Sequence, residues 1–88
     1  MPHEPYQFKF TPRDSVLKLA DAMEEALRYN EHRGTWLIDD IQPLINKAQA
    51  ALDELDFANG NTNNQAVYHH SVTVANYMMM IADNVRGK

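Results

Sequence analysis

Residues 65–85 constrain the fold most, because they have the composition of one long helix that is apolar on nearly every side. Two sets of apolar side chains lie on different sides of this helix: Val67, Val74, Met78 and Ile81, and Val72, Ala75, Met79 and Ala82. Such a helix is usually buried on more than one side. Three helices of one small chain can hardly cover it, so the pattern predicts a helical-bundle homodimer or homotetramer. A wholly intramolecular core is the alternative.

A first helix is expected upstream, between Thr11 and Gly34. Thr11 is a plausible N-cap, Pro12 suits the first helical position, and Asp14 stands where a capping box has its acid. The apolar stripe of this helix consists of Val16, Leu19, Ala20, Met23 and Leu27.

A second helix is expected from Asp39 or Asp40 to Phe57 or Ala58, with Pro43 in its first turn. Its predicted stripe is Ile41, Ile45, Ala48, Leu52 and Leu55. The run 59–64 is rich in asparagine and predicts a tight surface loop, in which Asn63 or Asn64 caps the third helix. The chain is therefore expected to be an all-α, three-helix protomer.

The length of 88 residues predicts one domain, over 11–88, preceded by an extended arm over 1–10. Cores of this size are marginal, and without cysteine no disulfide can support them, which again favours oligomerisation. In the arm, Tyr6, Phe8 and Phe10 alternate with polar residues. We interpret these aromatics first as a cover for the chain's own core, and otherwise as a contact for a partner.

Composition argues against several classes of function. The formal net charge of −4 argues against general nucleic-acid binding, and no apolar run is long enough to span a membrane. The first residues resemble no secretory signal, so a cytoplasmic protein is expected. No nucleophile elbow or phosphate-binding glycine loop is present. His69 and His70 are adjacent and diverge on a helix, so they do not chelate one ion together.

One stretch of the sequence suggests a family. Residues 74–84, Val-Ala-Asn-Tyr-Met-Met-Met-Ile-Ala-Asp-Asn, resemble the third helix of the small, largely phage-borne MazG-like proteins. Residues 23–36, which include Trp36, are similar to the first helix and the connector of that family. Residues 44–55 match the spacing of its second helix. The resemblance covers roughly residues 16–85.

The resemblance implies an all-α homodimer or homotetramer related to enzymes that hydrolyse nucleoside triphosphates to monophosphate and pyrophosphate. In that family two acidic pairs, ExxE and ExxD, hold magnesium, and the metal activates a water. The matching positions here are Ala51, Glu54, His70 and Thr73. Only Glu54 keeps a carboxylate, so the resemblance implies an inactive relative that has lost its magnesium cofactor.

Three specific functions remain open at this point, beside a purely structural role. The first is an inactive phage or prophage protein that binds a host protein in the host cytoplasm. It would bind through Tyr6, Phe8 and Phe10, or through the family's substrate cleft around His70. The second is a nucleotide-binding module without hydrolysis, in which Trp36 stacks on the base, Asn76 reads it and Arg33 meets the phosphates. The third is a residual pyrophosphohydrolase with a transition metal on Glu54 and His70.

Overall fold

The structure is a computed structural model that describes residues 6–30 and 36–86. These residues form three helices: α1 (Asp14–Tyr29), α2 (Gln42–Gly60) and α3 (Asn64–Arg86). No strand occurs in these two described ranges. The prediction of an all-α chain with three helices is confirmed. No helix of the described part is long and apolar enough to cross a membrane.

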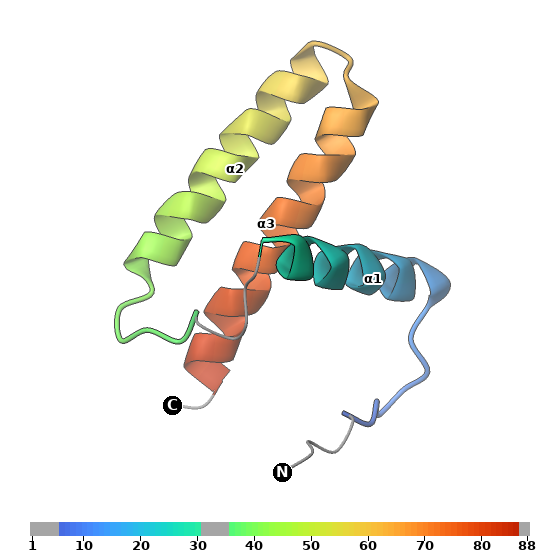
Figure 1. The fold of residues 1–88 in the computed structure, drawn as a ribbon, viewed down its shortest axis with the longest axis vertical. Helices are drawn as coiled ribbons and strands as arrows, with labels where there is room; N and C mark the ends of the chain where they lie inside the picture. Colours follow the sequence, from blue (N-terminus) through green and yellow to red (C-terminus); the bar gives the residue numbers. More distant parts are fainter. Residues whose placement is uncertain (1–5, 31–35, 87–88) are drawn as a thin grey trace.

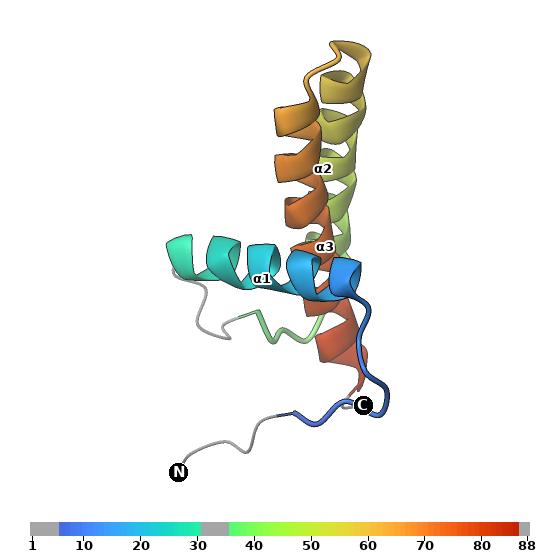
Figure 2. The same ribbon diagram turned by 90° about the vertical axis from the view of Figure 1, so that its right-hand side faces the viewer.

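Helices α2 and α3 form an antiparallel hairpin, and α1 lies across α3 (Figures 1 and 2). The hairpin turns at 61–63, where Thr62 has a positive φ of 52°. The side-chain oxygen of Asn63 accepts a hydrogen bond from the backbone N–H of Ala66 at 3.1 Å. This bond confirms that Asn63 caps α3, because the first N–H groups of a helix lack partners within the helix.

Helix α1 begins later than predicted. The prediction that Thr11 caps it and Pro12 starts it is wrong, because Arg13 is still extended (φ −67°, ψ 154°). The carbonyl of Arg13 accepts hydrogen bonds from the N–H groups of Val16 and Leu17. Asp14 lies in the first turn, where its carboxylate pairs with Lys18 at 2.9 Å.

Helix α2 begins at Gln42, two or three residues after the predicted start at Asp40 or Asp39, and Pro43 lies in its first turn as predicted. Asp40 stays outside the helix and accepts a hydrogen bond from the N–H of Gln42 at 2.9 Å. The predicted apolar stripe is partly wrong. Leu52 is exposed, whereas the buried residues of α2 are Leu44, Ala48, Ala51 and Ala58.

The core of the described residues is small. It consists of Leu27, Leu44 and Met80, against which Trp36, Tyr77, Met79 and Ile81 pack. None of the larger described side chains is fully buried. The three consecutive methionines differ in environment, since Met80 is buried, Met79 packs on the core and Met78 is half-exposed. Consecutive residues of a helix point to different sides, which is why the three methionines lie in different environments.

Candidate functional site

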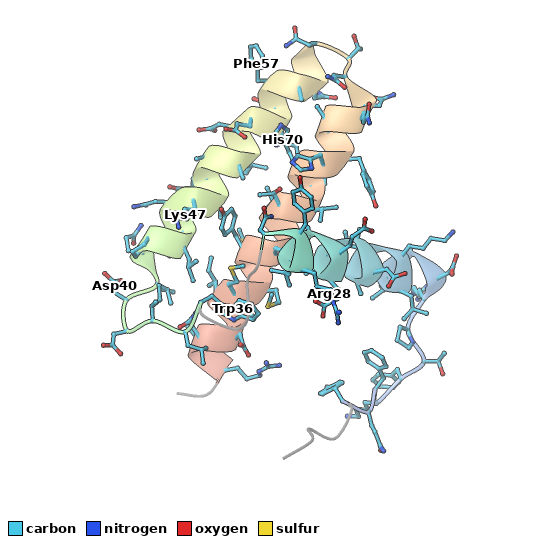
Figure 3. All side chains as sticks on the ribbon, viewed as in Figure 1. Arg28, Trp36, Asp40, Lys47, Phe57 and His70 are labelled. Atoms are coloured by element: carbon cyan, nitrogen blue, oxygen red, sulfur yellow. The ribbon has the colours of Figure 1, made fainter. Side chains whose placement is uncertain are left out.

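Two residues at positions that correspond to metal ligands in the MazG-like family, according to the resemblance, lie together between α2 and α3. Glu54 of α2 and His70 of α3 are paired, with Glu54 Oε2 and His70 Nδ1 3.5 Å apart. Figure 3 shows the His70 ring between the two helices. The pair lines an open pocket of about 390 Å³ near the hairpin turn, together with Asp53 and Phe57.

Ala51 and Thr73 lie one turn farther from the hairpin turn, on α2 and α3 respectively. Because the hairpin is antiparallel, these two positions are at the same level along it. Ala51 is buried, and the Thr73 hydroxyl donates to the backbone carbonyl of His69 at 3.2 Å. No group of three or more metal-binding side chains occurs among the described residues. Glu54 is thus the single carboxylate at the four positions.

A second pocket, of about 510 Å³, lies at the other end of the hairpin. Trp36, Tyr77 and Met80 give it an aromatic and apolar lining, and Asp40 and Lys47 bring one charge of each sign. Figure 3 shows Trp36, Asp40 and Lys47 from the connector and α2 around this end of the molecule. An arrangement of apolar walls with a few polar groups is typical of small-molecule sites.

Trp36 is held in this pocket by two residues at the end of α3. Its indole N–H donates to Asp83 Oδ2 at 3.0 Å, and its backbone carbonyl accepts from Asn84 Nδ2 at 2.9 Å. Asn84 Nδ2 also donates to the carbonyl of Met80 at 2.8 Å, and Asn84 Oδ1 accepts from the N–H of Ile38 at 2.7 Å. The connector is therefore fixed to α3 on both sides of Leu37.

Asp83 is the acceptor that satisfies the indole. The hydrogen bond from Trp36 holds the pKa of this carboxyl below its ordinary value of 3.8, and the hydrogen bond and charge of Arg86 act in the same direction. Sequence reasoning named neither Asp83 nor Asn84 as a structural anchor. The amino-acid sequence contains only a weak signal for this contact, because Asp83 and Asn84 are far in the chain from the connector that carries Trp36.

Asn76 does not belong to the Trp36 pocket. Its side chain is 6% exposed, and its Nδ2 donates to the carbonyl of Met23 in α1 at 3.2 Å. Its Oδ1 is buried and has no hydrogen-bond partner among the residues that the structure describes. The structure therefore separates Asn76 from Trp36, although both were predicted to contact a nucleotide. Arg33, the third residue of that prediction, lies outside the described residues.

The aromatic side chains of the arm do not cover the core, so the first interpretation of them is wrong. Tyr6 is 78% exposed, Phe8 62% and Phe10 77%. Tyr6 and Phe8 contact each other edge to face, with ring centroids 5.6 Å apart, and Lys9 lies 5.7 Å from the ring centroid of Phe10. Three large aromatic side chains of one short segment are therefore exposed to solvent.

Comparison of this chain with protein-family models, with curated proteins and with solved structures finds no match.

Proposed function

We propose that this chain is a catalytically inactive MazG-like protein whose helical scaffold binds another protein. The observation that carries the proposal is which residues occupy the four positions between α2 and α3 that match the metal ligands of that family, namely 51, 54, 70 and 73. They hold a buried alanine, a threonine bonded to its own helix and a glutamate paired with a histidine. Magnesium prefers an octahedron of oxygen ligands, which this set does not provide.

A protein partner is supported by the exposed aromatic and aliphatic side chains. Besides the arm, Val16, Leu17 and Leu19 of α1 and Phe57 of α2 are exposed. Interfaces between proteins are enriched in aromatic residues, which bury a large area at small conformational cost. The resemblance to largely phage-borne proteins makes a host protein in the host cytoplasm the partner that we propose.

The proposed loss of the magnesium site is tested by restoring the carboxylates that the family has at these positions. Ala51→Glu, His70→Glu and Thr73→Asp together restore the four family carboxylates, and Ala51→Gln, His70→Gln and Thr73→Asn form an isosteric, uncharged control. Magnesium should raise the unfolding temperature of the carboxylate variant only. Wild-type protein should release no pyrophosphate from any nucleoside triphosphate with magnesium or manganese. Metal-dependent hydrolysis that is lost in Glu54→Ala would instead establish a residual enzyme.

The binding function is tested with a photo-crosslinking amino acid in place of Phe8, in cells of the cognate host. The control carries it in place of Lys18, which is exposed and polar on α1. One defined adduct at Phe8 but not at Lys18 is expected, and it should disappear when Tyr6 and Phe10 are both alanine. Equal adducts at both positions, or none, contradict a partner surface on the arm.

A second candidate function, nucleotide binding without hydrolysis, is favoured by the pocket around Trp36. An aromatic base stacks well on indole and phenol rings, and Lys47 supplies a cation for a phosphate. Trp36 is the sole tryptophan of the chain, so its fluorescence reports this pocket directly. Quenching by one nucleotide, weakened in Lys47→Ala but not in Lys18→Ala, would support this candidate. No quenching at millimolar nucleotide would exclude it.

A further inference from the structure

The turn end of the α2–α3 hairpin is acidic and carries no lysine or arginine. Between Lys47 and Arg86 the sequence has neither residue type, whereas Asp53, Glu54 and Asp56 lie close together on α2. No lysine or arginine of the described residues forms an ion pair with any of these three carboxylates. This end of the molecule therefore presents negative charge that no described lysine or arginine neutralises.

Two of these carboxylates line a pocket together with an aromatic ring. We call the open pocket of about 390 Å³ near the hairpin turn, lined by Asp53, Glu54 and Phe57 of α2 and by His70 of α3, the hairpin pocket. Residues three and four apart on a helix are neighbours on its surface, so the Phe57 ring lies beside both carboxylates. Phe57 is 76% exposed, which leaves its ring free for a ligand (Figure 3). Asp56 does not line the pocket.

The acceptor atoms of the hairpin pocket are only partly used within the chain. Glu54 contacts His70 through Oε2, 3.5 Å from Nδ1, and its Oε1 is left for a ligand. Asn61, which also lines the pocket, donates its Nδ2 to the carbonyl of Phe57 at 3.1 Å, so its Oδ1 is left as an acceptor. The Asp53 carboxylate has no ion-pair partner among the described residues. The pocket therefore offers several acceptors beside an aromatic face.

A planar organic cation fits this set of groups better than an anion or a metal ion does. Guanidinium donates from five N–H groups in one plane, bridges carboxylates and stacks on an aromatic ring. An anion would be repelled by Asp53 and Glu54, and magnesium requires an octahedron of oxygen ligands. The described residues contain no group of three or more metal-binding side chains. An ammonium ion is a compact, strongly hydrated charge that cannot bridge and stack at once.

We propose that the hairpin pocket binds an arginine side chain of the partner protein. The inference rests on the proposed function, in which this chain binds another protein, and it names the chemistry of one contact. The open shape favours a protein as the source, because small-molecule sites bury most of their ligand, whereas an arginine on a protein surface is covered by its own neighbours. Arginine is also enriched in interfaces between proteins. The pocket lies at the hairpin turn, away from the arm (Figure 1).

The first test titrates the whole chain with blocked arginine, N-acetyl-arginine methylamide, and follows the backbone amides by two-dimensional NMR. Blocked citrulline is the control, because it has nearly the same shape without the charge. Arginine should shift the amides of Asp53, Phe57 and His70 saturably. The dissociation constant should be millimolar, because Glu54 is 67% exposed and its attraction to a cation is screened by water. No shift of these amides by arginine, or an equal shift by citrulline, would overturn the proposal.

The second test removes one group at a time and compares matched variants. Asp53→Asn should weaken arginine binding about threefold or more, whereas Asp56→Asn, which removes the same charge from the same helix outside the pocket, should change it less than about twofold. Phe57→Ala should weaken binding about threefold or more because stacking is lost, and Leu52→Ala, exposed on α2, should not. Equal effects of the two aspartate substitutions would show that net charge alone attracts arginine, which contradicts a specific pocket.

Other cations distinguish other occupants. Blocked lysine should bind more weakly than blocked arginine, and equal binding would refute the assignment to arginine. Magnesium or manganese that shifts the same amides at a lower concentration than arginine would assign the pocket to a metal ion instead. None of these probes requires the host partner. Arginine binding without an adduct at Phe8 therefore rejects the arm contact alone, and an adduct at Phe8 without arginine binding rejects the hairpin pocket alone.

Discussion

Asn76 and Asn84 occupy two of the four buried positions of α3, where an apolar side chain is the usual occupant. Both residues bind backbone that is distant in sequence, Asn76 on α1 and Asn84 on the connector. Amide side chains can donate and accept at once, which is why one asparagine satisfies both Trp36 and Ile38. These two residues tie separate segments to the longest helix.

Replacing Asn84 by alanine should lower the free energy of unfolding by about 2–3 kcal/mol, because backbone groups of the connector lose their partners. Asn46→Ala is the matched control. Asn46 is exposed on α2 and accepts one hydrogen bond, from Gln42 at 2.9 Å. Urea denaturation followed by circular dichroism measures both variants. Similar small effects in the two would show that the connector is not anchored through Asn84.

The lowered pKa of Asp83 predicts a pH dependence of stability. A carboxyl whose pKa is lower in the folded chain than in the unfolded chain stabilises the fold above its ordinary value of 3.8. That contribution is lost as the pH falls from about 5 through the folded pKa. The stability difference between wild-type protein and Asp83→Asn should therefore be largest near neutral pH and shrink in acid. A difference that does not change with pH contradicts the ion pair and the charged acceptor for Trp36.

At the scale of elements, the three helices follow from local signals, whereas their exact buried sides do not. The Asn63 cap agrees with the prediction from asparagine-rich turn chemistry, whereas the loop 61–63 is shorter than the predicted run 59–64, because α2 continues to Gly60. In α2, however, alanines lie on several sides, and the apolar pattern did not decide which of them faces α3. Contact with α3 selected Ala51 and Ala58 for burial and left Leu52 exposed.

Removing the cap with Asn63→Ala should destabilise the chain by about 1 kcal/mol, because the first turn of α3 loses its side-chain acceptor. Asn59→Ala, in the last turn of α2, changes the same chemical groups at an exposed position without a capping bond. Thermal unfolding of the two variants should separate them. An equal loss in both would mean that the cap contributes nothing measurable.

At the scale of the whole molecule, one small cluster joins all three helices, since Leu27 comes from α1, Leu44 from α2 and Met80 from α3. Helix α1 crosses the hairpin instead of lying along it (Figure 2). Leu27, in its second half, is the residue that α1 gives to the buried cluster. Cooperative unfolding of α1 with the hairpin therefore depends on few side chains.

Leu27→Ala should lower the free energy of unfolding by about 2–4 kcal/mol, because it removes a buried side chain from the shared cluster. Leu19→Ala, on the same helix but exposed, should cost less than about 1 kcal/mol. Chemical denaturation of both variants at one protein concentration provides the comparison. Equal losses of unfolding free energy in the two variants would mean that α1 is not held to the hairpin chiefly through Leu27.

The all-α class, three helices of nearly correct extent and the capped turn could be predicted from the amino-acid sequence, because these features depend on apolar periodicity and on residues next to each other in the chain. The expectation that the third helix also packs on a second copy of the chain stays a prediction. Three contacts could not be predicted from the sequence: the pair of Glu54 and His70, the hydrogen bonds of Trp36 with Asp83 and Asn84, and the contact of Asn76 with α1. Those outcomes depend on how the helices are rotated and crossed, and packing between residues far apart in the chain sets that geometry.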